Sequence, residues 1–240
     1  MAQERIYRQL YKAKDLVYFN VKVEQTDLDI AARSMLRKEA LQLVKRYRKD
    51  IEEYIKRDRS FLISLTPIPC FPDAPDIVRR MCYAAQMAGV GPMAAVAGAI
   101  SEFVGRELLK FSDEIIVENG GDIFIKSQQD RVVGIYAGDS PLSNKIGLRI
   151  LAKDTPVGIC TSSGKIGHSL SFGKADAVMI LSKDTALADA VATAVGNIVK
   201  GADDMQKGID YARRIEGVSG VVIIVEDKFG AWGDIYLVKL

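Results

Sequence analysis

Apolar and polar residues alternate near the amino terminus of the chain. Val17, Phe19, Val21 and Val23 are each separated by one more polar residue, which is the two-residue period of a half-buried strand. We expect this strand to be the second arm of a hairpin whose first arm lies around residues 7–11.

From residue 36 the apolar period changes to that of a helix. Apolar side chains recur at steps of three and four residues, at Leu36, Ala40, Leu43, Val44, Tyr47, Ile51, Tyr54 and Ile55. The opposite face is largely basic, and Thr26 followed by Asp29 is a candidate cap. The pattern predicts a long amphipathic helix. Its basic face is either solvated or in contact with a polyanion, and no motif supports the polyanion.

The next segment contains breaks made by proline and glycine. Residues 61–66 (FLISLT) are expected to form a strand that Pro67 and Pro69 stop. Asp73 with Pro75 should open one helix, and Pro92 a second that runs to about residue 110. Residues 81–100 are weakly polar, but AGVGP interrupts them, so two buried helices are expected rather than a membrane span.

The rest of the chain alternates short apolar runs with two further helical patterns. We expect helices at 185–199 and 205–214, and strands at 113–118, 122–126, 131–136, 145–151, 158–161, 175–181, 220–225 and 233–238. Antiparallel-like runs of strands with long helices between them predict an α+β fold.

Composition limits the class of protein. The 240 residues are 48% hydrophobic and 27% charged, which is ordinary globular usage. A net charge of +2 argues against a nucleic-acid partner. The first ten residues hold no apolar signal region, and three cysteines cannot form a closed disulfide framework. These features predict a cytoplasmic protein in a reducing compartment, with no membrane partner.

Several common sites lack their signatures. His168 is the only histidine, which excludes zinc sites rich in histidine. Neither the dinucleotide fingerprint G-x-G-x-x-G after a strand nor the P-loop pattern is present, and no two cysteines have C-x-x-C spacing. Cys160 ends an apolar run, so we expect a buried thiol rather than a nucleophile, with a persulfide carrier as the alternative.

Three segments remain as candidates for chemistry, and the first is the run from Glu118 to Asp122. Asn119 and Gly120 form the strongest short hairpin signal. Gly121 and Asp122 would also let a ligand approach the backbone closely. The segment is therefore either a turn alone or a turn that contacts a ligand.

The second segment is CTSSGKIGHS, residues 160–169. Its small residues Thr161, Ser162, Ser163 and Gly164 leave backbone N–H groups accessible, and Lys165 adds positive charge. Such a stretch forms either an anion-binding nest or a plain polar loop. His168 lies inside it rather than on an apolar face, which favours a functional role for this histidine.

The third segment lies on the helix expected at 185–199. Asp189 and Thr193 are four residues apart and share one face of an otherwise apolar helix. A carboxylate and a hydroxyl are hard oxygen ligands that suit Mg²⁺. The alternative is structural, with Asp189 interacting with the helix dipole and Thr193 bonding back to a carbonyl.

The ordered set of these segments resembles the ApbE family, flavin transferases once linked to thiamine biosynthesis. The matching runs, in chain order, are GPMAAVAGAISEFVGRELL, NGGDIFI, TSSGKIGHS, ADAVATAV and IEGVSGVVIIVED. The similarity covers about residues 89–240. The whole chain looks still closer to short, uncharacterised cytosolic ApbE-like proteins of archaea and anaerobic bacteria.

The resemblance implies a fold and a site. It implies a single ApbE-like domain over residues 1–240, T-fold-like, with mixed or antiparallel sheets packed against long helices. Residues of about 1–66 would be a family-specific hairpin and long helix. By resemblance Asp189 and Thr193 would hold Mg²⁺ at the pyrophosphate of FAD, and the turn at Gly120 and Gly121 would face the nucleotide. His168 would be the catalytic residue, and FMN would pass to a threonine of a partner protein.

The chain also departs from the transferase pattern. Ala97 and Gly98 stand where the family has a Lys-Gly pair, and the run H-x-x-D-P-x-x-G is absent after the TSSG loop. Three functions are therefore considered. They are a protein that binds flavin or another nucleotide with Mg²⁺, accessory to sulfur assimilation by resemblance; an Mg²⁺-dependent FMN transferase; and a non-catalytic module that docks a protein partner. The oligomeric state does not follow from the sequence.

Overall fold

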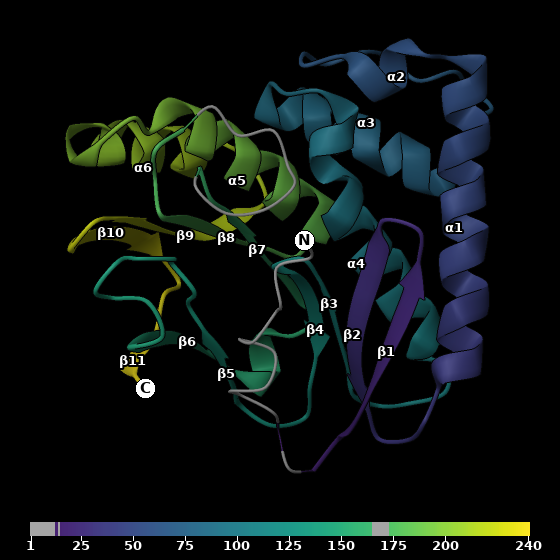
Figure 1. The fold of residues 1–240 in the computed structure, drawn as a ribbon, viewed down its shortest axis with the longest axis horizontal. Helices are drawn as coiled ribbons and strands as arrows, with labels where there is room; N and C mark the ends of the chain where they lie inside the picture. Colours follow the sequence, from purple (N-terminus) through teal and green to yellow (C-terminus); the bar gives the residue numbers. More distant parts are fainter. Residues whose placement is uncertain (1–12, 14, 165–172) are drawn as a thin grey trace.

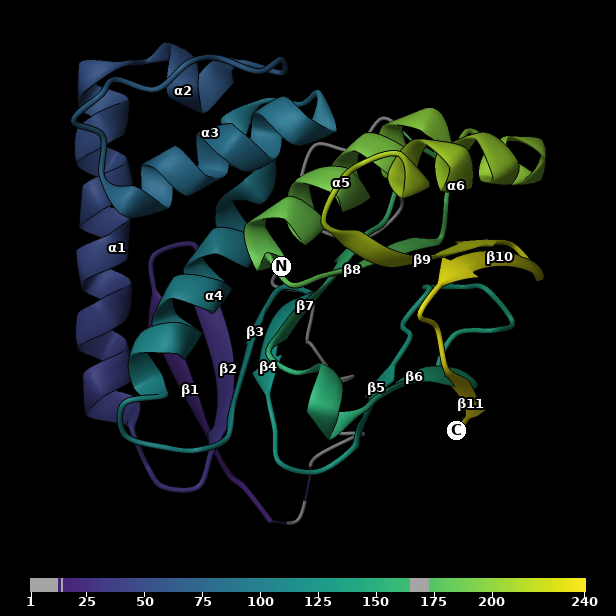
Figure 2. The same ribbon diagram turned by 180° about the vertical axis from the view of Figure 1, so that it is seen from behind.

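The computed structural model describes residue 13 and residues 15–164 and 173–240. These residues form an α+β fold with an eight-stranded sheet in the order β1-β2-β3-β4-β7-β8-β9-β10 and a three-stranded sheet in the order β11-β6-β5. Neighbouring strands in both sheets are antiparallel. Figures 1 and 2 show helices on one face of the large sheet and the small sheet on the other.

The amino-terminal strand has a hairpin partner that was not predicted from the sequence. Strand β1 (Val17–Val23) is confirmed, but it pairs with β2 (Thr26–Ala32), so the expected cap at Thr26 and Asp29 is wrong. Thr26, Leu28 and Ile30 are buried and alternate with aspartates, which is again the two-residue period of a strand. The region 7–11 lies outside the described residues.

The long helix is confirmed as α1 (Arg37–Arg57). Its buried face carries Ala40, Val44, Tyr47, Ile51 and Tyr54. On the polar face, Arg48 pairs with Glu52 at 2.7 Å and Lys49 with Glu53 at 3.7 Å. These pairs neutralise part of the basic face, which favours the solvated interpretation.

The strand expected at residues 61–66 is wrong. Residues Ser60–Ile63 form one helical turn, α2, and the chain then runs irregularly to residue 75. The Asp58 side chain accepts a hydrogen bond from the Ser60 N–H at 3.0 Å, which favours this turn. Ile63 and Leu65 are exposed, so these two apolar side chains do not belong to the core.

Two helices meet at a glycine and proline joint, as predicted for residues 81–100. Helix α3 (Asp76–Ala88) ends at Gly89, which has a φ of 65°, and the short helix η2 (Pro92–Ala95) leads into α4 (Val96–Leu108). The pair is bent by 105°. Among the described residues no single helix is long and apolar enough to span a membrane, and this bent pair meets the length and composition requirement only when its two parts are taken together.

A disulfide bond corrects the expectation that all three cysteines are reduced. Cys70, in the irregular segment before α3, is bonded to Cys82 within α3. The two residues are 12 positions apart and their Cα atoms are separated by 6.3 Å. Three cysteines allow one bond and leave one cysteine over. That cysteine, Cys160, is free and buried.

The remaining elements follow the predicted order with shifted ends. They are β3 (Ile115–Asn119), β4 (Asp122–Lys126), β5 (Arg131–Gly134), β6 (Ile146–Ile150), η3 (Ala152–Asp154), β7 (Val157–Ser162), β8 (Ala177–Ser182), α5 (Thr185–Ile198), η4 (Ala202–Asp204), α6 (Met205–Arg213), β9 (Val218–Val225), β10 (Lys228–Gly233) and β11 (Leu237–Lys239). The single strand expected at 233–238 is wrong. Gly233, at a φ of 92°, ends β10, and β11 joins the small sheet instead.

Two apolar cores lie on the two faces of the large sheet. The larger core fills the space between the sheet and the helices, and the smaller one lies between the two sheets. Helix α5 packs on β7 and β8, and α4 packs on β3 and β4. The crossing of α4 and α5 therefore lies directly above the middle strands of the sheet (Figure 1).

Candidate functional site

The predicted hairpin turn is present at the end of β3. Asn119 pairs with Asp122 in the register, so Gly120 and Gly121 alone form the turn. Their φ values are 70° and 107°, the left-handed conformations that a tight two-residue hairpin turn requires. The Gly121 N–H donates to Oε1 of Glu118 at 2.8 Å, which closes the turn with a carboxylate whose contact was not predicted from the sequence.

This hairpin is joined to the start of α4. Nδ2 of Asn119 donates to the carbonyl oxygen of Ala97 at 3.1 Å. The next residue, Gly98, donates its N–H to Oδ2 of Asp189 at 2.8 Å. Residues from β3, α4 and α5 are therefore connected by two hydrogen bonds at one point.

Glycine at position 98 is what allows this approach. A Cβ there would lie 2.4 Å from the carbonyl oxygen of Thr185 and 2.8 Å from Cβ of Asp189. Gly158 in β7 serves the same purpose, since a Cβ there would lie 2.5 Å from Cα of Thr185. The first turns of α5 are thus fitted closely against both α4 and β7.

The start of α5 is held by two acidic side chains. Oδ1 of Asp184 accepts from the Leu187 N–H at 3.1 Å as the helix cap, and Oε2 of Glu102 accepts from the Thr185 N–H at 2.6 Å. Glu102 is a buried acid within the apolar α4. A single acid on an apolar helical face is the signal that could have revealed it.

Asp189 and Asp122 lie in one electrostatic environment. Burial raises the pKa of Asp189 to about 7. Burial also raises the pKa of Asp122, and the nearby Asp189 and Glu118 carboxyls raise it further. Among the described residues neither Asp122 nor Asp189 has an ion-pair partner. A cation placed between them would relieve this repulsion and favour their ionised forms.

Cys160 belongs to the same cluster but not as a nucleophile. It pairs with Asp122 across β4 and β7, is fully buried, and donates its S–H to the carbonyl oxygen of Thr185 at 3.3 Å. Burial, and then the Asp122 and Asp189 charges, raise the pKa of the Cys160 thiol well above its ordinary value. The buried strand residue predicted from the sequence is confirmed, and the thiol is protonated at neutral pH.

The TSSG segment, residues 161–164, lies partly in β7 and partly after it. Thr161 and Ser162 are the last residues of β7, while Ser163 and Gly164 follow it, and all four are half-buried. Gly121 faces this strand end, since a Cβ there would lie 3.6 Å from the Thr161 carbonyl oxygen. Lys165 and His168 lie outside the described residues, so the predicted nest and the catalytic histidine stay predictions.

The second predicted metal ligand, Thr193, lies one turn beyond Asp189 on α5 and is half-buried like it. Asp189 also caps the amino terminus of α4 through Gly98, which supports the structural alternative for this carboxylate. Among the described residues no group of three or more His, Cys, Asp or Glu side chains could hold a metal ion. A metal here would need further ligands from water or from a bound molecule.

Two cavities flank this cluster without including Asp122 or Asp189 in their walls. One, of about 350 Å³, lies beyond Gly164 and Gly173 and is lined by Lys174 and Lys200. The other, of about 680 Å³, lies between α1, α3 and α4 and contains Glu102 in its wall. We assign the candidate site to the cluster formed by Gly98, the Gly120–Gly121 turn, Asp122 and Asp189, because the two carboxyls lie close together there beside the backbone of the turn.

Comparison with known proteins gives close relatives of this chain. A family model described as AbpE bacteria matches residues 8–228. A UPF0280 protein of Methanococcus aeolicus is 46% identical over 79% of this chain and 79% of its own length. UPF0280 proteins of Methanocella arvoryzae and Methanocaldococcus jannaschii are 41% and 40% identical, over 88% and 82% of this chain and 86% and 82% of their own lengths.

Solved structures share the fold at low identity. The Pseudomonas stutzeri flavinyl transferase ApbE in its apo form superimposes with a TM-score of 0.62 at 14% identity, covering 91% of this chain and 94% of that one. The ApbE protein of Thermotoga maritima gives 0.61 at 11% identity, covering 90% and 96%. At these identities the comparison supports the fold alone.

Proposed function

The chain belongs to the family described as AbpE bacteria, and from this premise we propose that it binds a nucleotide diphosphate, such as FAD, together with Mg²⁺. The binding site is the cluster where the β3–β4 turn, the end of β7 and the α4–α5 crossing meet. The observation that supports this most strongly is the closeness of two carboxyls without an ion-pair partner among the described residues, the buried Asp122 and the half-buried Asp189, beside a turn that carries no side chains.

The proposed metal ligands are Asp189 and Thr193. Both supply oxygen atoms from one face of α5, and burial raises the pKa of Asp189 to about 7, so a nearby cation would favour its ionised form. When bound, Mg²⁺ would neutralise the diphosphate. One Asp189 oxygen is already used by the Gly98 N–H, which fixes the direction of the carboxylate before any ligand arrives.

The nucleotide itself would approach the glycine turn and the strand end. Glu118 holds the Gly121 N–H, so the turn keeps its shape while presenting its backbone to a ligand. Asn119, Gly120 and Asp122 complete this surface, with Thr161, Ser162, Ser163 and Gly164 beside it. Lys165 would add positive charge for phosphate oxygens.

The nucleotides carried by protein isolated under native conditions test this proposal. The protein is purified with excess Mg²⁺, denatured, and the released small molecules are identified by chromatography and mass spectrometry. We expect a nucleotide diphosphate that an EDTA wash removes. Absence of any nucleotide, combined with no binding of added FAD or ADP, would contradict the proposal. Asp203→Asn, which removes an exposed acid in η4, is the control for nonspecific loss of charge.

Flavin transfer is the second candidate function, favoured by the fold shared with ApbE structures. In that reaction the pyrophosphate bond of FAD breaks, FMN joins a threonine hydroxyl of a partner protein, and AMP leaves. His168 would act in the proton transfer. Incubation with FAD, Mg²⁺ and candidate acceptor proteins should release AMP in proportion to protein-bound flavin; free AMP without labelled acceptor would count against transfer.

Other expectations stay predictions. They are the cytoplasmic location, the accessory role in sulfur assimilation towards homocysteine, the protein partner, and the organisation of residues 1–240 as one domain. A non-catalytic docking function of the basic face of α1 is weakened by its ion pairs.

A further inference from the structure

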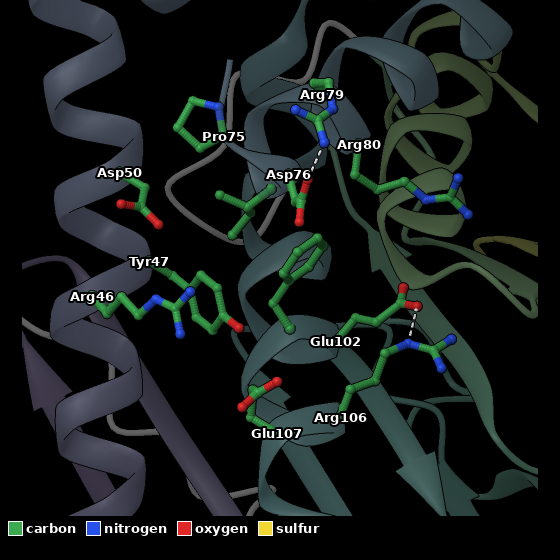
Figure 3. A pocket seen from close by; sticks show the side chains of 12 residues that line it. Arg46, Tyr47, Asp50, Pro75, Asp76, Arg79, Arg80, Glu102, Arg106 and Glu107 are labelled. Atoms are coloured by element: carbon green, nitrogen blue, oxygen red, sulfur yellow. Dashed lines mark hydrogen bonds and ion pairs between the residues drawn. The ribbon is translucent and has the colours of Figure 1, made fainter. Parts of the chain in front are cut away.

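The cavity between α1, α3 and α4 is separate from the proposed nucleotide site. It measures about 680 Å³, within the range of small-molecule pockets. Figure 3 shows α1 on one side and charged side chains from α3 and α4 on the other. Its lining residues are Arg46, Tyr47, Asp50, Pro75, Asp76, Ile77, Arg79, Arg80, Glu102, Phe103, Arg106 and Glu107.

Tyr47 brings an unused hydroxyl to this cavity. Its side chain is buried, with 7% exposed, and its ring packs edge-on against Phe103 with centroids 5.3 Å apart. Among the described residues the hydroxyl has no hydrogen-bond partner, although it lies in the cavity wall. Burial, followed by the Glu107 charge, raises the pKa of Tyr47, so the neutral phenol can both donate and accept a hydrogen bond.

Arg46 and Asp50 are opposite charges that do not pair with one another. They lie four residues apart on α1, the spacing at which the neighbouring Arg48–Glu52 and Lys49–Glu53 pairs form. Arg46 instead stacks over the Tyr47 ring, 5.4 Å from its centroid. Within the described part of the chain, neither Arg46 nor Asp50 has an ion-pair partner.

The other charged side chains of the cavity already have partners. Arg79 pairs with Asp76, Arg80 with Asp184 at 2.7 Å, and Arg106 with Glu102 at 2.7 Å. Glu107 is paired with Lys110 at 2.7 Å. One cation, one anion and one phenol are therefore left to meet a ligand.

We propose that this cavity binds a small zwitterion, specifically a free α-amino acid. Its carboxylate would pair with Arg46, its ammonium group with Asp50, and the Tyr47 hydroxyl would bond to the carboxylate. Ile77 and Phe103 form the apolar wall for the amino acid side chain.

The charge arrangement selects this class over simpler ions. Phosphate would face the acids Asp50, Asp76 and Glu107, and a plain amine would leave Arg46 without a counter-charge. Side chains one helical turn apart have Cβ atoms about 5–6 Å apart. That spacing suits a ligand whose two charges are separated by a single carbon atom.

Calorimetric titration of the full-length protein tests the proposal with a panel of free amino acids with small, branched and aromatic side chains. The same amino acids with an acetylated amine or an amidated carboxyl, and inorganic phosphate, complete the panel. We expect at least one free amino acid to bind, and each blocked form to bind about tenfold more weakly or worse, as expected for losing one ion pair.

Variants separate this cavity from nonspecific binding. Arg46→Gln and Asp50→Asn should each abolish the discrimination against the corresponding blocked form, while Tyr47→Phe should weaken binding. Lys49→Gln, on the solvated face of the same helix, is the matched control and should change nothing. Any of four results would overturn the proposal. They are no binding by any free amino acid, equal binding of free and blocked forms, tighter binding of phosphate, and an effect of Lys49→Gln equal to that of Arg46→Gln. Nucleotide binding at Asp189 is measured in parallel, and its failure would leave this result unaffected.

Discussion

Substitution of Gly98 by alanine is the sharpest test of how α4 and α5 build the site. A Cβ at this position would lie 2.4 Å from the carbonyl oxygen of Thr185 and 2.8 Å from Cβ of Asp189. Ordinary van der Waals contacts of a Cβ begin near 3.4 Å. Since a backbone carbonyl cannot rotate away, the two helices must separate by about 1 Å.

The expected energies come from two opposing effects. Replacing glycine by alanine inside a helix stabilises by about 1 kcal/mol. Forcing an extra methyl group into a closely packed contact costs about 1–3 kcal/mol. We therefore expect Gly98→Ala to lower the free energy of unfolding by up to about 2 kcal/mol, which leaves the protein folded.

The substitution should also weaken ligand binding at the site. The same separation would lengthen the bond from the Gly98 N–H to Asp189, now 2.8 Å, beyond the range of a hydrogen bond. Asp189 would lose its fixed direction, and binding of FAD with Mg²⁺ should weaken about tenfold, the equivalent of about 1.4 kcal/mol.

Urea unfolding and calorimetric titration with FAD and Mg²⁺ measure the two effects. The control is Gly201→Ala, because nothing lies within 4 Å of a Cβ there. If Gly98→Ala gains stability by the full helical propensity and binds FAD as tightly as wild type, the close crossing of α4 and α5 does not position the site.

Three further predictions concern buried groups. Glu114 is fully buried and is held by Ser127, by Arg33 and by Arg131 at 2.8 Å. Burial opposes its ionisation, but the Ser127 and Arg131 hydrogen bonds prevail and lower the pKa of Glu114. The ionised Glu114 carboxylate therefore stabilises the folded protein above the unfolded-state pKa, and this contribution is lost as the pH falls through the folded-state pKa. In urea titrations across pH, Glu114→Gln should lower the free energy of unfolding by about 3 kcal/mol at neutral pH and by much less in acid. An equal loss at neutral and acid pH would contradict this. Cys82→Ser opens a loop of 12 positions and should lower the free energy of unfolding by about 3 kcal/mol. In thermal scans, wild type should be as unstable as Cys82→Ser only when a reductant is present. Cys160, buried and with a raised pKa, should resist iodoacetamide in the native protein and react after denaturation, as peptide mass spectrometry can record; rapid native alkylation would refute its assignment as an inert thiol.

Local patterns predicted the elements that local chemistry determines. The helical apolar period from residue 36 and the Asn119–Gly120 turn signal both depend on residues close in the sequence. The structure confirms both, with seven of the eight apolar positions in α1 and Leu36 at its cap. Strand β2 was missed because Thr26 and Asp29 also match a helix cap, and only pairing with β1 and β3 decides between the two. Residues 61–66 have the composition of a strand, but Ser60–Ile63 form a helical turn and residues 64–66 are irregular.

The site was predictable in part for the same reason. The sequence identified Asp122 and Asp189 separately, and the fold brings their charges together. The sequence could not predict the contacts that Gly98, Glu102 and Glu118 make, because tertiary packing sets them. For Glu102 the one local sign is its place as a single acid on the apolar face of α4. The Cys70–Cys82 bond likewise depends on the return of the chain from the irregular segment onto α3.

The Mg²⁺ dependence of nucleotide binding tests the central claim most directly. FAD is titrated into wild type and into Asp189→Asn by calorimetry, with excess Mg²⁺ and with EDTA. Because two protein side chains are too few to hold Mg²⁺ tightly alone, metal and nucleotide should bind with positive coupling of about 1–3 kcal/mol. Wild type should bind FAD much more tightly with Mg²⁺, and Asp189→Asn should bind it equally weakly under both conditions. Equal binding by wild type with Mg²⁺ and with EDTA, or no binding under either condition, would contradict the account.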